Sequence, residues 1–264
     1  MLRRIVQGVL GAFGYKLVTL EAAKPSWGLT QFFPLLQQFG FAPTSIWDVG
    51  ANRGDWTRAA LRYFPSADYT LVEPQDHLKA CLAGEMRAGH RIRWVNAGAG
   101  DQPGLLPLYI SEKDQSSSFL DYDRIKGAAV RKIDVPIRTL NEIRASLSLP
   151  VPEMLKIDAE GFDLKVLEGA SDFLGTTEIV LAEAAVAQLD FDNSARNLIN
   201  RMDGYGYRLL EITDLHRSPG EGVLWLCELA FLLKSSPLFA RARYGAGSRE
   251  GVPFNAANRR SVQV

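Results

Sequence analysis

The stretch 45-SIWDVGANRGDWT-57 decides the fold, because a short apolar run, residues 45–49, enters a glycine turn and a helix-like stretch follows at once. Gly50 has no Cβ, so the backbone can turn and approach a ligand closely. Asn52 stands where many nucleotide loops have a second glycine, and asparagine tolerates the positive φ of such a turn. Gly54 then opens the helix, whose N-terminus attracts an anionic group. The stretch predicts the first strand–loop–helix unit of an open α/β sheet.

Apolar runs of strand length alternate with helical stretches along most of the chain. The expected strands are residues 45–49, 69–73, 92–96, 153–158 and 178–183. The expected helices are residues 28–39, 54–63, 76–87, 162–173 and 194–203. This alternation predicts a parallel sheet with helices on both faces. Two later runs, 206–212 and 224–234, flank a loop with proline and glycine and predict an antiparallel pair.

The sequence divides into three parts of different character. Residues 1–43 are expected to form a helical N-terminal extension, and residues 44–234 form the α/β domain. Within that domain, residues 101–140 are irregular and predict a β-rich insertion over the mouth of the site. Residues 235–264 are rich in Ser, Gly, Asn and Arg, which predicts a weakly ordered tail.

Charge and cysteine content limit the classes of function. The 264 residues carry 30 Lys plus Arg and 30 Asp plus Glu, so the formal net charge is zero. A nucleic-acid partner is not expected, because such proteins usually show a basic excess. Two cysteines, with no metal-ligand spacing, indicate a reducing compartment. We therefore predict a cytoplasmic protein.

The N-terminal 18 residues place apolar side chains on one side of a helix and two arginines elsewhere. Two interpretations remain open. The helix packs on the domain, as most amphipathic helices do, or it lies on a membrane surface. In the second case the protein would sit at the inner face of the membrane. The sequence does not predict the oligomeric state.

The acids at the ends of the first two strands indicate the ligand. Asp48 precedes the glycine turn and can accept a hydrogen bond from an ammonium group, whereas it would repel a diphosphate. Glu73 ends the second strand, where an acid typically accepts from ribose hydroxyls. Two of the three glycines of a dinucleotide loop are missing, and so is the Gly-Lys-Ser/Thr of a P-loop. S-adenosylmethionine fits this pattern as a nucleoside with an amino group and no phosphate.

Together, the stretches DVGANRGDWT, LVEP, VNAGAGDQPG, VPIRTLNEI and above all LKIDAEGFDLKVLEGA resemble the FkbM-type methyltransferases, which have the class I S-adenosylmethionine-dependent fold. The resemblance covers roughly residues 44–234. It implies a seven-stranded sheet of order 3-2-1-4-5-7-6 with strand 7 antiparallel. It also implies O-methylation, often of the hydroxyl of a sugar or natural product.

The resemblance assigns cofactor contacts by position. The methionine end of S-adenosylmethionine is expected to lie against Asp48, Gly50, Asn52 and Gly54, and its ribose against Glu73. Two residues after the third strand, Ala97 and Asp101, are expected near the adenine. For Asp101 a plain turn residue is an equal alternative, since it lies in the sequence Gly-Asp-Gln-Pro-Gly.

Three acids at the ends of the fourth and fifth strands are the catalytic candidates: Asp158, Glu160 and Glu183. Methyl transfer to a hydroxyl needs alignment and removal of the proton, which a carboxylate can perform as general base. The same acids could instead bind a divalent cation such as Mg²⁺ through oxygen ligands. The structural alternatives are a helix cap for Glu160 and an ion pair with Lys156. His77, His90 and His216 receive no role, and the last two are expected in loops.

Three functions are compared on this basis. The first is an S-adenosylmethionine-dependent methyltransferase that O-methylates a sugar, a glycan or a lipid-linked saccharide. The second is a nucleoside-binding interaction module without catalysis, against which the three acids argue. The third is an NAD-dependent oxidoreductase, against which the glycine pattern of the loop argues.

Overall fold

The structure is a computed structural model that describes residues 28–110, 117–119, 131–187, 191–218 and 220–238. Its helical elements in these ranges are α2 (Leu29–Gln38), α3 (Asp55–Leu61), the 3₁₀ helix η1 (Asp76–Leu82), α4 (Ala83–Arg87), α5 (Leu140–Ser146), α6 (Asp163–Glu168) and α7 (Ala195–Gly204). Its strands are β1 (Ser45–Val49), β2 (Asp68–Val72), β3 (Ile92–Val95), β4 (Gly98–Ala99), β5 (Gly104–Ile110), β6 (Arg131–Arg138), β7 (Met154–Ile157), β8 (Ile179–Ala185), β9 (Tyr207–Arg217) and β10 (Leu224–Leu233).

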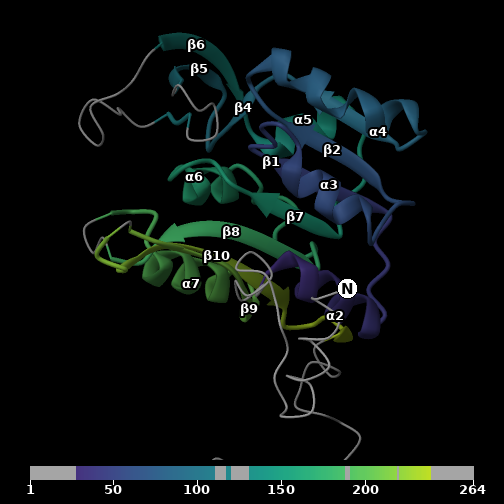
Figure 1. The fold of residues 1–264 in the computed structure, drawn as a ribbon, viewed down its shortest axis with the longest axis vertical. Coiled ribbons are helices and arrows are strands. Elements are labelled where there is room, and N and C mark those ends of the chain that lie inside the picture. Colours follow the sequence, from purple (N-terminus) through teal and green to yellow (C-terminus); the bar gives the residue numbers. More distant parts are fainter. Residues whose placement is uncertain (1–27, 111–116, 120–130, 188–190, 219, 239–264) are drawn as a thin grey trace, which may run out of the picture.

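Seven strands form the main sheet, in the order β3-β2-β1-β7-β8-β10-β9 (Figure 1). Numbered along the chain within this sheet, the order is 3-2-1-4-5-7-6. The strands β3, β2, β1, β7 and β8 pair in parallel, while β10 pairs antiparallel with β8 and with β9. The mixed α/β fold is therefore the one that the sequence predicted. Because β1 and β7 are neighbours, the loops after these two strands meet at one edge of the sheet.

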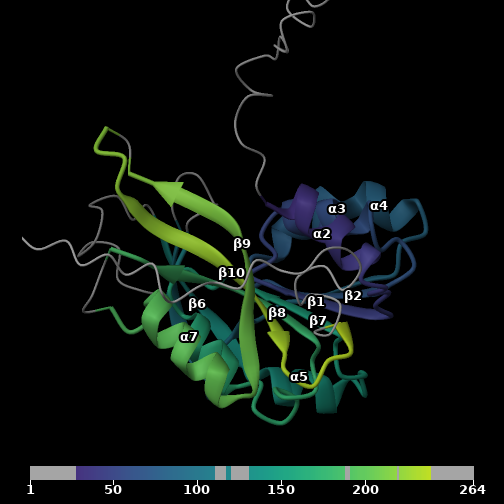
Figure 2. The same ribbon diagram turned by 90° about the horizontal axis from the view of Figure 1, so that it is seen from below.

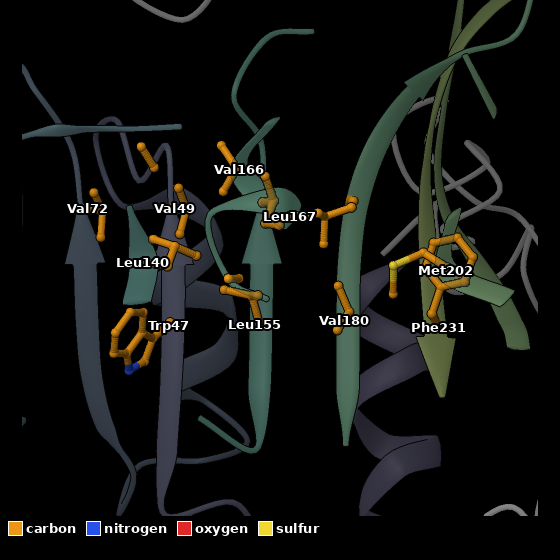
Figure 3. Close-up of a cluster of buried hydrophobic side chains, with 14 of the residues drawn as sticks. Trp47, Val49, Val72, Leu140, Leu155, Val166, Leu167, Val180, Met202 and Phe231 are labelled. Carbon is orange, nitrogen blue, oxygen red and sulfur yellow. The ribbon is translucent and has the colours of Figure 1, made fainter. Parts of the chain in front are cut away.

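Helices cover both faces of the sheet, with α2, α3 and α4 on one side and α5 and α7 on the other (Figure 2). On the first side Phe33 of α2 contacts the rings of Trp56, Tyr63 and Phe64 at centroid distances of 5.6 Å. On the second side side chains of β1, β7 and β8 meet those of α5, α6 and α7. Figure 3 shows this cluster, in which Trp47, Leu155 and Val180 rise from neighbouring strands. Burial on both faces explains why these strands are continuously apolar.

A second sheet has the order β4-β6-β5. Its strands β5 and β6 lie within the predicted insertion, whereas β4 precedes it. β5 and β6 pair antiparallel over their full lengths, from Gly104↔Ile137 to Ile110↔Arg131. Ser118 forms an isolated bridge with Tyr109 and extends this pairing. The remaining residues between β5 and β6 lie outside the described ranges. The boundaries that the sequence places at residues 43 and 234 stay a prediction.

Three elements differ from the sequence-based expectations. The helix α5 was not predicted, although Thr139 and Glu142 form a capping box at its start. The helix expected at 76–87 is divided into η1 and α4. His216 lies on β9, so its predicted place in a loop was wrong.

The N-terminal stretch 1–18 and most of the expected tail lie outside the described residues, so both interpretations of the N-terminal helix stay predictions. Among the helices that the structure describes, none has the length and apolar character needed to cross a bilayer.

Candidate functional site

The loop after β1 owes its shape to the close approach of the loop after β7. Gly50 has φ of 72°, and a Cβ built on it would lie 1.8 Å from the carbonyl oxygen of Asp158. Asn52 has φ of 46°, as its residue type predicted. Because Gly50 has no side chain, the loops after β1 and β7 can approach each other closely. This contact brings Asp158 next to the loop after β1.

Glu73 joins the first loop to the second. Its Oε2 accepts a hydrogen bond from the backbone N–H of Asn52 at 2.9 Å, and its Oε1 accepts from that of Gln75 at 2.9 Å. The side chain is buried, and this desolvation raises the pKa of Glu73 although the two N–H groups act in the opposite direction. Each carboxyl oxygen can still accept a further hydrogen bond, as the vicinal hydroxyls of a ribose would provide.

A small cavity connects these loops at the sheet edge. It has a volume of about 60 Å³. Its wall is formed by Gly50, Asn52, Glu73, Pro74, Gln75, Leu108, Ser117, Phe119, Asp158, Ala159 and Glu160. Residues from separate loops therefore line one space. The sequence assigned five of them to the cofactor or to catalysis: Gly50, Asn52, Glu73, Asp158 and Glu160.

The insertion closes this cavity on one side. The hydroxyl of Ser118 donates to the carbonyl oxygen of Glu160 at 2.9 Å. The ring of Phe119 lies against Gly98, where a Cβ would come within 2.5 Å of the ring, and 5.5 Å from the ring of Phe162. Ligand pockets usually measure about 300–1,000 Å³, so this cavity is smaller than a nucleoside site.

Asp48 lies beneath the loop and not in the wall of the cavity. Its side chain is fully buried, and its Oδ2 accepts from the hydroxyl of Thr57 at 2.5 Å. Its Oδ1 lies 3.2 Å from Nζ of Lys156, which is also 3.3 Å from Oδ2 of Asp158. The direct ammonium contact expected for Asp48 is therefore replaced by Lys156, whose charge links Asp48 to Asp158.

The three catalytic candidates occupy neighbouring strand ends. Asp158 and Glu160 line the cavity, whereas Glu183 lies one strand further along, where β8 pairs Glu183 with Glu228 of β10. Burial, followed by the nearby charges of Asp158 and Asp163, holds the pKa of Glu183 well above its usual range. Because a raised pKa favours the neutral acid, Glu183 is a poor proton acceptor, and Asp158 is the carboxylate best placed for that task.

Three other predicted cofactor residues stay away from the cavity. Gly54 has φ of 79° and starts α3 against the side chain of Leu82. Ala97 is buried in the core beside β3. Asp101 lies in the turn between β4 and β5, which is the alternative that the sequence left open. The structure thus brings the ribose end of the predicted site together, but not its adenine end.

Several polar residues near the site were missed by sequence reasoning. His216 Nε2 lies 3.2 Å from Oδ2 of Asp214 and 3.9 Å from Oε1 of Glu183. The hydrogen bond with Asp214 raises the pKa of His216. Glu228 accepts from the hydroxyl of Thr213 at 2.5 Å. Glu183 and Glu228 lie on predicted strands, whereas Asp214 lies beyond the predicted run 206–212, and the pairing of β10 with both β8 and β9 brings the three acids together.

Asp163 and Asn193 form a buried connection between α6 and β8. Nδ2 of Asn193 donates to Oδ2 of Asp163 at 3.1 Å and to the carbonyl oxygen of Glu183 at 2.9 Å. Oδ1 of Asp163 accepts from the backbone N–H of Glu183 at 3.3 Å. Burial and the charge of Asp158 raise the pKa of Asp163 to about 7. The connection holds the end of β8 beside the loop that carries Glu160.

The acids do not form a metal centre in the part of the chain that the structure describes, because no three His, Cys, Asp or Glu side chains there are placed to hold an ion. The cation alternative for Asp158, Glu160 and Glu183 thus finds no support in this arrangement.

The model of the methyltransferase FkbM domain matches residues 48–209. This match covers more than half of the chain, from the end of β1 to the start of β9. The chain belongs to the FkbM methyltransferase family. The loops described above lie within the matched region.

Comparison with solved structures finds methyltransferases of low sequence identity. An FkbM methyltransferase from Methylobacillus flagellatus KT is 16% identical with a TM-score of 0.47, over 71% of this chain and 43% of that chain. The precorrin-6y C5,15-methyltransferase of Geobacter metallireducens GS-15 is 11% identical with a TM-score of 0.42, over 76% and 85%. This chain therefore spans less than half the length of the Methylobacillus protein. No curated protein matches the sequence.

The residues at the sheet edge fit the ribose of S-adenosylmethionine. Among the residues that the structure describes, none forms a hydrogen bond with the buried Oε1 of Gln75, which lines the cavity together with Glu73. A buried polar atom without a partner is costly, and a ligand hydroxyl or amino group would satisfy it. The fit therefore rests on the donor-poor, acceptor-rich wall formed by Glu73 and Gln75.

Proposed function

We propose that this FkbM-family protein transfers a methyl group from S-adenosylmethionine to a hydroxyl of a sugar, a glycan or a lipid-linked saccharide. One observation carries the proposal: Glu73 and Asp158 line the same cavity, although 85 residues separate them. Glu73 is an acceptor for ribose hydroxyls, and Asp158 is a carboxylate beside the position where the reacting end would lie. S-adenosylmethionine supplies an electrophilic methyl group when bound.

The residues of this chain then have separate tasks. Glu73 and Gln75 hold the nucleoside through its hydroxyl and amino groups. Asp158 would accept the proton of the acceptor hydroxyl while the hydroxyl oxygen takes the methyl group, and the S–CH3 bond of the cofactor would break to release S-adenosylhomocysteine as a neutral thioether. Lys156, 3.3 Å from Oδ2 of Asp158, keeps that carboxylate oriented from below. General base assistance of this kind contributes about 10²–10⁴-fold to the rate.

The first experiment is a calorimetric titration of the purified protein with S-adenosylmethionine, with NAD and NADP titrated in parallel. We expect saturable binding of S-adenosylmethionine alone, followed by transfer of labelled methyl to a saccharide or glycolipid fraction. Asp158→Asn should lower kcat by about 10²–10⁴-fold and leave the Kd of the cofactor within about twofold. Binding of a nicotinamide cofactor in its place, or full activity of Asp158→Asn, would contradict the proposal.

A further inference from the structure

A wide groove between α6 and α7 has no part in the cofactor site. Its volume is about 920 Å³, within the range of about 300–1,000 Å³ that is usual for ligand pockets. It begins at Gly161, and the preceding residue, Glu160, lines the small cavity described above. Two adjacent residues of the chain, Glu160 and Gly161, thus line the two hollows. Helix α7, which contributes to the lining of the groove, lies on the face of the sheet opposite α2 (Figure 2).

Aromatic rings and small polar side chains alternate along the groove. Phe162, Phe191 and Tyr205 are half-buried, so each offers part of its ring to the hollow. Asn197 and Asn200 are exposed on α7 beside them. An aromatic face packs well against the C–H face of a pyranose ring, and an amide can donate to and accept from its hydroxyls.

The charges of the groove balance within it. Arg201 Nη1 pairs with Oε1 of Glu168 at 2.7 Å, which ties α7 to α6. Nζ of Lys165 lies 4.9 Å from the centroid of the Phe162 ring. Asp192, between β8 and α7 in the sequence, also lines the groove. Two basic and two acidic side chains thus line the groove. A balanced lining favours a neutral, hydroxyl-rich ligand over a polyanion, which would require an excess of positive charge.

The lining of the groove is hydrogen-bonded to β8 near Glu183. Asn193 lines the groove and donates to both Asp163 and the carbonyl oxygen of Glu183. A ligand bound in the groove would therefore rest on the same buried connection that positions the end of β8. Binding of remote parts of a substrate can be used to position the reacting part.

We propose that this groove binds further sugar units of an uncharged saccharide acceptor, whose methylated unit extends past Glu160 toward Asp158. The inference rests on the proposed function, because it names the class of acceptor and the surface that selects it. It predicts that the protein prefers an oligosaccharide to the corresponding monosaccharide, since a single unit cannot reach both the groove and the cavity.

The test uses the full-length protein on a printed array of neutral and anionic glycans, without cofactor and with S-adenosylmethionine. The best neutral glycan is then titrated against Asn200→Trp, which fills the groove from an exposed position on α7. Gln38→Trp is the matched control, because Gln38 is an exposed polar residue on α2, across the sheet. We expect neutral glycans to bind, Asn200→Trp to weaken that binding at least tenfold, and Gln38→Trp to have no effect.

The outcomes separate the groove from the cofactor site. The proposal that the groove binds glycans is supported if Asn200→Trp loses glycan binding while the parent protein keeps it. The Kd for S-adenosylmethionine should then be equal in the two proteins. Three outcomes overturn the proposal that the groove binds neutral glycans. They are equal glycan binding in both variants, binding of anionic glycans only, and no binding to any glycan. A dimer that dissociates in Asn200→Trp also overturns it, because the groove would then be a protein interface. Failure to bind S-adenosylmethionine contradicts the proposed function, while the glycan titration without cofactor still decides the groove.

Discussion

Nζ of Lys156 lies 3.2 Å from Oδ1 of Asp48, and the two side chains are 4% and 0% exposed. Burial on its own lowers the pKa of Lys156, but the charges of Asp158 and Asp48 outweigh it and hold this pKa above the usual value. The ion pair joins β1 to β7 directly beneath the glycine loop. The ammonium group of Lys156 therefore lies below the loop and contacts both Asp48 and Asp158. We expect the stability of the fold and the proposed methyl transfer to depend on this group.

Lys156→Met should destabilise the protein by about 3–5 kcal/mol, because it leaves the carboxylate of Asp48 buried without its partner. The double variant Asp48→Asn/Lys156→Met should recover part of this loss, since it removes both charges. The free energy of unfolding from chemical denaturation measures both effects. An interaction energy near zero between the two substitutions would show that the pair does not stabilise the fold.

Gly50→Ala should abolish cofactor binding and destabilise the protein strongly. A Cβ at Gly50 would lie 1.8 Å from the carbonyl oxygen of Asp158, so one of the two loops must move. Gly89→Ala is the control, because Gly89 also has a positive φ, of 92°, but open space around its Cβ position. It should lose only about 1–2 kcal/mol from backbone strain. Thermal unfolding compares the two variants, and similar losses would argue against the close approach as the cause.

Glu73→Gln should weaken binding of S-adenosylmethionine by about 10–100-fold, the loss expected for hydrogen bonds to a charged group. The substitution keeps the size of the side chain but replaces one of its two acceptor oxygens by a donor amide, and each of these oxygens now accepts from a backbone N–H, Oε2 from Asn52 and Oε1 from Gln75. Calorimetric titration gives the Kd, and Gln38→Ala on the exposed side of α2 serves as control. An unchanged Kd would remove Glu73 from the cofactor site.

The sequence predicted the sheet because its signals are local. The central parallel strands β1 and β7 are buried on both faces, so they appear as mostly apolar runs, and the residue types of Gly50 and Asn52 indicate the turn. The capping box at Thr139 and Glu142 is equally local and predicts α5 once it is noticed. Helix α6 is shorter than expected, since its apolar pattern continues into the turns after Glu168.

The site was less predictable, because its contacts join residues far apart in the chain. That Asp48 faces Lys156 depends on the pairing of β1 with β7, in which these two residues are partners although they lie 108 positions apart in the chain. The place of His216 beside Glu183 depends on two antiparallel pairings, through β10 to β9. Neither relation leaves a pattern at short spacing, and the register of the strands determines both.

Because Asp163 titrates, the free energy of unfolding should fall as the pH rises from about 4 to about 7. Burial raises its pKa from 3.8 to about 7 in the folded chain. Between these two values the folded chain holds a proton that the unfolded chain releases, so the free energy of unfolding falls with pH. The contribution is fully present below the lower value and lost above the higher one. At about 1.4 kcal/mol for each pH unit, the loss over this window is roughly 4 kcal/mol.

Asp163→Asn tests this dependence, because the amide does not titrate and keeps the size of the side chain. The slope of the unfolding free energy against pH, measured by denaturation between pH 4 and pH 7, should become less negative by about 1.4 kcal/mol per unit. The absolute stability is not the readout, since the amide also replaces an acceptor that Asn193 contacts. Asp172→Asn, at an exposed acid after α6, should leave the slope as it is. An unchanged slope in Asp163→Asn would mean that this carboxyl does not hold its proton in the folded protein, and that the connection between α6 and β8 is made by a carboxylate.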